Sequence, residues 1–236
     1  MSKEIAVLMA AGLGSRMAPL TKKVPKPLVK AHNRSMIDTV ISGLEKRGVD
    51  HIYIVVGYLG EQFGFLAEKY PNITIIENKE YNEKNNISSI HAAAEVMGTA
   101  DCFICEADLF VSDPSIFEAK LDRSCYYGKL VKGYSDDWVF DLDEKGFITR
   151  VGRCGTDTYN MVGVSYFKQK DAKIIADAVL EAYKHKGHEQ LYWDEIVDQQ
   201  LGKLKLVINP VTADQIVEID SVKELAEFDP DYEKYN

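Results

Sequence analysis

The stretch that decides the fold runs from residue 5 to residue 29, Ile5-Ala-Val-Leu-Met-Ala-Ala-Gly-Leu-Gly-Ser-Arg-Met-Ala-Pro-Leu-Thr-Lys-Lys-Val-Pro-Lys-Pro-Leu-Val29. It begins with an apolar run, Ile5 to Met9, which is typical of a buried strand in a parallel sheet. Small residues and two glycines follow, and they let the backbone come close to a ligand and adopt positive φ. Successive backbone N–H groups in such a loop can point at phosphate oxygens. The stretch therefore predicts a strand followed by a phosphate-binding loop.

Two cations accompany this loop. Arg16 follows the second glycine, and Lys26 stands between Pro25 and Pro27, which fix φ on both sides and predict an extended, stiff segment. The pattern is not the dinucleotide fingerprint, because Met17 stands where the third glycine would be, and it is not a Walker A loop, because no Gly-Lys-Ser/Thr follows. An ordinary strand-to-helix turn with surface basic residues is the alternative interpretation.

Charge is distributed unevenly over the 236 residues, whose net charge is −9. Residues 1–30 contain six lysines and arginines against one glutamate, a local net charge of +5. An acidic chain of this kind argues against a general nucleic-acid surface, so no nucleic-acid partner is expected. One basic island suits a local anion site, with a solvated basic loop as the alternative.

The sequence carries no sign of membrane insertion or export. No apolar stretch approaches the roughly 20 residues of a membrane span, and Met1 leads directly into a predicted strand, so we expect a cytoplasmic protein. Cys102 and Cys105 have the C-x-x-C spacing, but residues three apart on a strand point to opposite faces. We therefore predict buried free thiols rather than a metal or redox pair.

Strand and helix patterns alternate in the first half of the chain, with strands at 51–56, 73–76 and 101–106, helices at 36–47, 63–67 and 87–97, and a polar loop at 81–86. Later segments predict strands at 125–132, 137–142, 147–152, 159–167, 205–208 and 216–219, and helices at 171–186, 193–201 and 221–228. We predict an α/β fold in one Rossmann-like domain, residues 1–236. Its mixed, mostly parallel central sheet has helices on both faces and a smaller antiparallel extension.

Two Glu-x-Asp triplets end predicted strands, Glu106-Ala-Asp108 and Glu218-Ile-Asp220. Ligands of open α/β sheets bind at the carboxyl ends of the strands, so we expect Asp108 and Asp220 to meet over one site. Transfer reactions at phosphorus commonly use Mg²⁺ held by one or two carboxylates. We predict Asp108 and Asp220 as ligands of Mg²⁺, with Glu106 and Glu218 close by. Solvated turn carboxylates are the alternative.

Both tryptophans stand beside acids in the later part of the chain. Trp138 follows Asp136 and Asp137, and Trp193 precedes Asp194. Aromatic faces and carboxylates are what a quaternary ammonium group requires, because this cation cannot donate hydrogen bonds. Burial in the core is the alternative for both rings, and for Trp193 it is as much expected as a role in binding.

The N-terminal stretch resembles the signature of the nucleotidyltransferases that join a nucleoside triphosphate to a small phosphorylated compound. The resemblance implies a nucleotidyltransferase domain in which the glycine loop and its arginine hold the triphosphate. It also implies that the lysine between prolines contacts the reacting phosphates. Carried over to this sequence, these residues are Ala10, Gly12, Gly14, Ser15, Arg16 and Lys26.

Other stretches resemble a narrower family, the bacterial CTP:phosphocholine cytidylyltransferases. They are Val56-Gly-Tyr-Leu-Gly-Glu-Gln-Phe63, Asn85-Asn-Ile-Ser-Ser-Ile90, Asp136-Asp-Trp138, Leu191-Tyr-Trp-Asp194 and Glu218-Ile-Asp-Ser221. The resemblance implies that the nucleobase lies beside Gly57, Tyr58, Asn85, Asn86 and Ser88. It further implies a choline pocket lined by Trp138, Tyr192 and Glu218 and supported by Asp194.

The resemblance also implies the reaction. The phosphate of phosphocholine attacks the α-phosphorus of CTP in line, with Mg²⁺ bound, and gives CDP-choline and pyrophosphate without a covalent intermediate. Arg16, Lys26, Asp108 and Asp220 are the expected catalytic residues. A sugar-1-phosphate nucleotidyltransferase and a non-catalytic nucleotide-binding module are the alternatives. The sequence specifies no oligomeric state.

Overall fold

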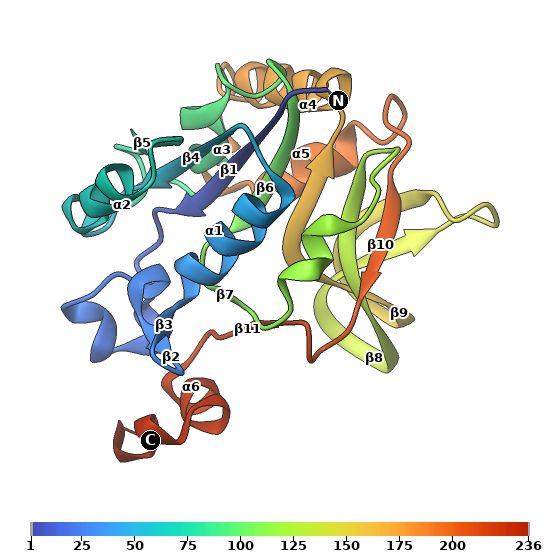
Figure 1. Ribbon diagram of the computed structural model, residues 1–236. Helices are drawn as coiled ribbons and strands as arrows, with labels where there is room; N and C mark the ends of the chain where they lie inside the picture. The colour runs from blue at the N-terminus through green and yellow to red at the C-terminus, as the bar shows by residue number, and fades with distance from the viewer. Residues whose placement is uncertain (1, 236) are drawn as a thin grey trace.

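The computed structural model describes residues 2–235 and has a seven-stranded central sheet in the order β10-β8-β9-β6-β1-β4-β5 (Figure 1). The strands are β1 (Glu4–Ala10), β4 (His51–Val56), β5 (Ile73–Glu77), β6 (Asp101–Glu106), β8 (Cys125–Leu142), β9 (Ile148–Phe167) and β10 (Val207–Val211). Every neighbouring pair is parallel except β6–β9 and β8–β9, which are antiparallel. This confirms the predicted α/β fold with a mostly parallel sheet.

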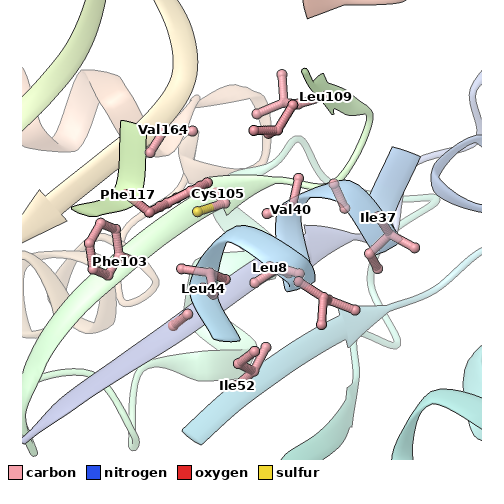
Figure 2. Packing of buried hydrophobic residues seen from close by; sticks show 14 of the residues in the cluster. Leu8, Ile37, Val40, Leu44, Ile52, Phe103, Cys105, Leu109, Phe117 and Val164 are labelled. Carbon is pink, nitrogen blue, oxygen red and sulfur yellow. The ribbon is translucent and has the colours of Figure 1, made fainter. Parts of the chain in front are cut away.

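Helices cover both faces of the sheet, as predicted (Figure 1). One face carries α1 (Met36–Arg47) and α2 (Gly64–Lys69), and the other carries α3 (Ile87–Ala93), α4 (Gln169–Ala182) and α5 (Trp193–Gln199). Alternate residues of β1 serve the two faces: Leu8 packs with Val40 and Leu44 of α1 (Figure 2), whereas Val7 joins the cluster under α3 to α5. Each such aliphatic side chain contributes about 1.5–3 kcal/mol by its burial.

A third, smaller core ties the C-terminal segment to the N-terminal loops. β7 (Leu109–Val111) pairs antiparallel with β11 (Ile216–Glu218), and α6 (Val222–Phe228) follows directly. The buried residues of this core come from both ends of the chain: Met17, Val29, Ala31, Met36, Phe110, Ile219, Val222 and Leu225. The structure thereby holds the end of β11 beside the glycine loop.

Helix boundaries follow local capping. Ser35 caps α1, which ends at Gly48 with φ 83°. Ser221 and Glu224 form a capping box at the start of α6. The predicted helices at 87–97 and 171–186 are shorter, because α3 ends at Ala93 and α4 at Ala182.

The remaining elements are short. β2 (Lys30–Ala31) and β3 (Arg34–Ser35) form a small two-stranded antiparallel sheet. Short 3-10 helices occur at Ser15–Met17, Leu20–Lys22, Lys26–Leu28, Gly60–Phe63, Pro114–Glu118, His188–Gln190 and Pro230–Tyr235.

The segment from 125 to 167 differs from its prediction. Four short strands were expected, but β8 and β9 are two long strands joined at the predicted turn, where Gly146 has φ 81°. Positive φ at Cys154 and Asp157 bends β9 without ending it, so that Val139 of β8 faces both Gly152 and Asn160. The expected antiparallel extension is therefore one irregular hairpin within the main sheet.

Cys102 and Cys105 lie in the cores on opposite faces of the sheet, which confirms two buried free thiols. Burial raises the pKa of both thiols. Among the helices of the described residues, none is long and apolar enough to cross a membrane.

Candidate active site

A cavity of about 550 Å³ opens at the carboxyl ends of β1 and β6, where ligands of open α/β sheets bind. The residues that line it come from the glycine loop, the 78–89 segment, the β8–β9 hairpin, the start of α5 and the end of β11. The site residues predicted from the sequence all lie within the described residues. All of them line this cavity except Gly57 and Tyr58. The hairpin adds Arg153, which the sequence did not single out.

The glycine loop is shaped by close packing against Lys26. Gly14 has φ 60°, and a Cβ at this position would lie 2.8 Å from the Cβ of Lys26, so no other residue fits without movement. Thr21 donates a hydrogen bond from Oγ1 to the carbonyl of Gly14 at 2.9 Å. Gly12 does not have positive φ, in contrast to the expectation for both glycines, and space is open around its α-carbon.

The Pro25-Lys26-Pro27 segment is not extended as predicted. Lys26 to Leu28 form a turn of 3-10 helix, with the N–H of Leu28 donating to the carbonyl of Pro25 at 2.9 Å. Pro27 tolerates this turn because its fixed φ of about −65° suits the first turn of a helix, where no N–H is required. The turn still fixes Lys26 firmly, and the residue is only 6% exposed.

Lys26 joins the two carboxylates that the sequence predicted to meet. Its Nζ lies 2.6 Å from Oδ2 of Asp108 and 2.6 Å from Oδ1 of Asp220, and Arg16 Nη2 lies 2.8 Å from the same Asp220 oxygen. Burial lowers the pKa of Lys26, but the charges and hydrogen bonds of the two aspartates outweigh it and raise the pKa above its usual value. Lys26 is therefore a fixed cation.

The pairing of β7 with β11 explains why these aspartates meet. Leu109 lies opposite Glu218, so that Asp108 and Asp220 leave the small sheet at the same end. One carboxylate oxygen from each of Asp108, Glu218 and Asp220 lies within 4.8 Å of the other two. Three hard oxygen donors at this spacing can hold a divalent cation such as Mg²⁺.

Further carboxylates crowd the same end of the cavity. Burial, followed by the charges of Asp108 and Asp220, raises the pKa of Glu218 to about 8. Burial, followed by the charges of Asp108 and Glu218, also raises the pKa of Glu106 well above its usual value. Such crowding favours the binding of cations here, because each added positive charge relieves the repulsion.

An aromatic wall adjoins these carboxylates. The rings of Trp138 and Tyr192 lie 5.3 Å apart between centroids and are tilted by 59°. Asp194 lies beside them, 3% exposed, and accepts a hydrogen bond from the hydroxyl of Tyr126 at 3.0 Å. Burial raises the pKa of Asp194 to about 7, although this hydrogen bond opposes the rise. Trp193, in contrast, is buried in the core under α4 and α5, the alternative that the sequence left open.

The 85–88 segment, which leads into α3, is held by hydrogen bonds within it and to its neighbours. Asn86 Oδ1 accepts a hydrogen bond from the backbone N–H of Trp193 at 3.0 Å, and Ser88 Oγ donates one to the carbonyl of Asn85 at 2.8 Å. Asn78 donates from Nδ2 to Ser88 Oγ at 2.9 Å. These bonds fix the polar wall of the cavity without using all its hydrogen-bonding groups.

Gly57 and Tyr58 lie behind this wall. A Cβ on Gly57 would come within 2.6 Å of the ring of Tyr81, which itself lines the cavity. The N–H of Tyr58 donates to the carbonyl of Ala11 at 3.1 Å. Both residues thus support the lining through their neighbours.

The comparison with known proteins assigns the family. Residues 6–135 match the family described as the MobA-like NTP transferase domain. The chain is 55% identical, over 98% of its length and 94% of the relative's, to the 2-aminoethylphosphonate cytidylyltransferase of Lancefieldella rimae. This chain belongs to the MobA-like NTP transferases.

Two further relatives of this MobA-like transferase are choline-phosphate enzymes. The choline-phosphate cytidylyltransferase of Streptococcus pneumoniae is 30% identical over 93% of this chain and 94% of that protein. The solved structure of the CTP:phosphocholine cytidylyltransferase from Streptococcus pneumoniae has a TM-score of 0.88 and 28% identity, and covers 97% of this chain and 98% of its own. The chain is therefore a cytidylyltransferase, which uses CTP and an acceptor bearing a phosphonate or phosphate group.

Several residues that line the cavity of this MobA-like transferase were not predicted from the sequence. Arg153 is one of two arginines in β9, and Tyr126 lies among other buried residues of β8, so neither position carries a local signal. Tyr81 and Lys84 lie in a polar loop whose composition gives no direction to individual side chains. The bending of the hairpin reveals that Arg153 lines the cavity, and the packing of α5 reveals that Tyr126 supports Asp194 from behind the lining.

Proposed function

We propose that this chain transfers CMP from CTP to 2-aminoethylphosphonate and releases pyrophosphate, in a reaction that requires Mg²⁺. The observation that carries this choice of acceptor is the 55% identity, over 98% of the chain, to the 2-aminoethylphosphonate cytidylyltransferase, compared with 30% to the choline-phosphate enzymes. The proposal replaces phosphocholine, the acceptor expected from the sequence alone.

The chemistry of the cavity supports an acceptor with a primary ammonium group. Such a group donates three N–H bonds, and carboxylates such as Asp194 and Glu218 are strong acceptors for charged donors. A quaternary ammonium group donates none, so it would leave the buried Asp194 carboxylate with the Tyr126 hydroxyl but no charged donor. Trp138 and Tyr192 add apolar walls for the two methylene groups.

The residues around the triphosphate supply position and charge. The N–H groups of the glycine loop, with Arg16 and Lys26, hold the phosphates of CTP, and Asn85, Asn86 and Ser88 lie beside the base. An oxygen of the phosphonate attacks the α-phosphorus, and the bond from that phosphorus to the bridging oxygen of pyrophosphate breaks. The phosphonate already carries the negative charge of the nucleophile, so no general base is required.

Asp108 and Asp220 are suited to hold Mg²⁺, because their oxygens converge within 4.8 Å, with an oxygen of Glu218 at the same spacing on the acceptor side. The bound ion supplies charge neutralisation at the reacting phosphates. Lys26 and Arg16, which now contact the aspartates, are long enough to turn toward phosphate oxygens from the same positions.

Phosphocholine is the second candidate acceptor, and the aromatic pair of Trp138 and Tyr192 favours it. Two rings can hold a quaternary ammonium group by cation–π contact, at about 0.5–2 kcal/mol for each ring. The solved phosphocholine enzyme shares the fold over nearly the whole chain, with a TM-score of 0.88.

Pyrophosphate release decides between the candidates. CTP is paired in turn with 2-aminoethylphosphonate, phosphocholine and glucose 1-phosphate in the presence of Mg²⁺, and UTP serves as the control nucleotide. We expect kcat/KM for 2-aminoethylphosphonate to exceed that for phosphocholine on the order of 100-fold, because the primary ammonium group can donate to the buried Asp194 carboxylate. A preference for phosphocholine would refute the proposed acceptor, and release only with the sugar phosphate would refute the amine pocket.

A further inference from the structure

Arg153 lies in the cavity wall that β9 contributes. It stands opposite Trp138 in the β8–β9 ladder, and both side chains line the cavity. Residues paired across a ladder have their Cβ atoms about 4.5–5.5 Å apart. Arg153 is therefore a neighbour of Trp138, and it shares the cavity with Asp194 and Glu218.

The charge of Arg153 is uncompensated, unlike that of the other cations of the site. Four basic residues of the described chain line the cavity, and three of them pair with a carboxylate: Arg16 and Lys26 with Asp220, and Lys84 with Glu80. Within residues 2–235, Arg153 forms no such ion pair, and its guanidinium donates to the carbonyl of Asp136 at 3.4 Å. An exposed arginine with free donors at a cavity wall can bind an anion from the cavity.

The backbone that carries Arg153 is held in place by a second arginine. Arg150 donates from Nη1 to the carbonyl of Arg153 at 3.2 Å and from Nη2 to the carbonyl of Cys154 at 3.0 Å. Arg150 is in turn fixed by Asp141, whose Oδ2 accepts from Nε at 2.6 Å. Because Cys154 has φ 66°, this brace stabilises the bend that turns Arg153 toward the cavity.

The acceptor presents a suitable anion at this place. Only two carbon atoms separate the ammonium and the phosphonate of 2-aminoethylphosphonate, so a phosphonate partner must lie close to the ammonium site. The planar fork of a guanidinium matches two phosphonate oxygens. Two of the paired cations, Arg16 and Lys26, lie in or against the glycine loop, where the triphosphate of CTP binds in the proposed function.

We infer that Arg153 binds the phosphonate group of the acceptor and orients its attacking oxygen toward the α-phosphorus of CTP. The inference rests on the proposed function and adds an acceptor-binding residue to it. The two anionic substrates thus bind to different parts of the protein: Arg153 of the hairpin binds the acceptor, and the glycine loop binds the nucleotide.

The test compares R153Q and R153K with the wild type in the full chain, by steady-state pyrophosphate release. Losing a bidentate charge-assisted contact raises KM for 2-aminoethylphosphonate about 10- to 100-fold in R153Q. KM for CTP stays unchanged. R153K, which keeps the charge but loses the fork, gives an intermediate KM for the acceptor. K132Q is the matched control, because Lys132 is an exposed cation of the same hairpin outside the cavity lining.

Each outcome decides the inference. An unchanged KM for the acceptor in R153Q overturns it, and so does a rise confined to KM for CTP, which would place Arg153 at the triphosphate. A lower thermal unfolding temperature with unchanged KM values would mean that Arg153 only supports the hairpin. If the wild type uses phosphocholine instead of 2-aminoethylphosphonate, the proposed function fails, and the KM of R153Q for phosphocholine decides the role of Arg153 by the same criterion.

Discussion

The two regions that form the cavity are built differently. β1 pairs with β4 and with β6 in register over six successive residues on each side, whereas the pairing of β8 with β9 shifts repeatedly between Tyr126 and Leu142. The regular region carries the glycine loop, and the irregular hairpin carries Trp138 and Arg153. Regular ladders fix a loop to one geometry, while bulges redirect single side chains.

This difference between the regular strands and the irregular hairpin can be compared with the names of the relatives. The relatives at 55% and 30% identity are both named as cytidylyltransferases, but for different acceptors. In the proposed function, a nucleotide site on the parallel sheet beside an acceptor wall on the hairpin would account for this pattern. The comparison predicts that changes near the glycine loop abolish turnover, whereas changes at the acceptor wall alter selectivity.

The largest effect is expected from Asp108→Asn or Asp220→Asn. Each substitution removes a full charge from the carboxylate cluster that is suited to Mg²⁺, and we expect kcat to fall about 1,000-fold or more, since metal neutralisation contributes several kcal/mol. Binding of Mn²⁺ in the absence of substrate, measured by electron paramagnetic resonance, should weaken in parallel. Asp122→Asn, at an exposed site outside the cavity, is the control, and a wild-type rate in folded Asp108→Asn would contradict the assignment.

Lys26→Gln is expected to have the next largest effect. The loss of a buried cation at the phosphates should lower kcat about 100-fold, with thermal unfolding checking that the fold persists. Because Lys26 now neutralises both Asp108 and Asp220, its loss should also tighten the binding of Mn²⁺ alone. Lys30→Gln, an exposed lysine four positions on, should leave both quantities unchanged. Weaker Mn²⁺ binding in Lys26→Gln would show that the lysine does not compete with the metal.

The sequence predicted the regular region well for a physical reason. A buried parallel strand requires a continuous apolar run, and a phosphate loop requires small residues, so both leave local patterns such as residues 5–16. The meeting of Asp108 with Asp220 was also predicted, but the expected reason was incomplete: Asp108 follows β6 of the central sheet, whereas the antiparallel pairing of β11 with β7 brings Asp220 to it. The small β7 escaped prediction, since Leu109 to Val111 is too short to show a period.

The hairpin was predicted less well, because its geometry depends on bends that composition does not mark. Cys154 and Asp157 adopt positive φ without being glycine, so nothing local predicted that β9 would continue past them. Arg153 reaches the site only through that bend. The prediction of an extended Pro25-Lys26-Pro27 segment was wrong for a related reason. Proline fixes its own φ, but the ψ angles of the segment depend on its packing against Gly14.

The smallest effect is expected at Asp194, and it tests the acceptor wall through pH. With a pKa raised to about 7, Asp194 becomes an ionised partner for an ammonium group only as the pH rises through about 7. KM for the acceptor should therefore fall across that range in the wild type. Asp194→Asn should raise KM about 10-fold at pH 8 and remove its dependence on pH. Tyr126→Phe removes the hydrogen bond that lowers this pKa, so its KM profile should shift to higher pH.

Stability should move in the opposite direction over an overlapping range of pH. Between the ordinary value of 3.8 and about 7, the folded protein holds a proton on Asp194 that the unfolded chain has lost, so the free energy of unfolding falls as the pH rises. Asp194→Asn should flatten this slope in the ligand-free protein, as measured by denaturant unfolding at several pH values. The carboxylate that we propose for acceptor binding therefore lowers the free energy of unfolding of the ligand-free protein as the pH rises. An unchanged slope in Asp194→Asn would instead mean that its pKa is ordinary and that the crowded carboxylates at Glu106 and Glu218 dominate the titration.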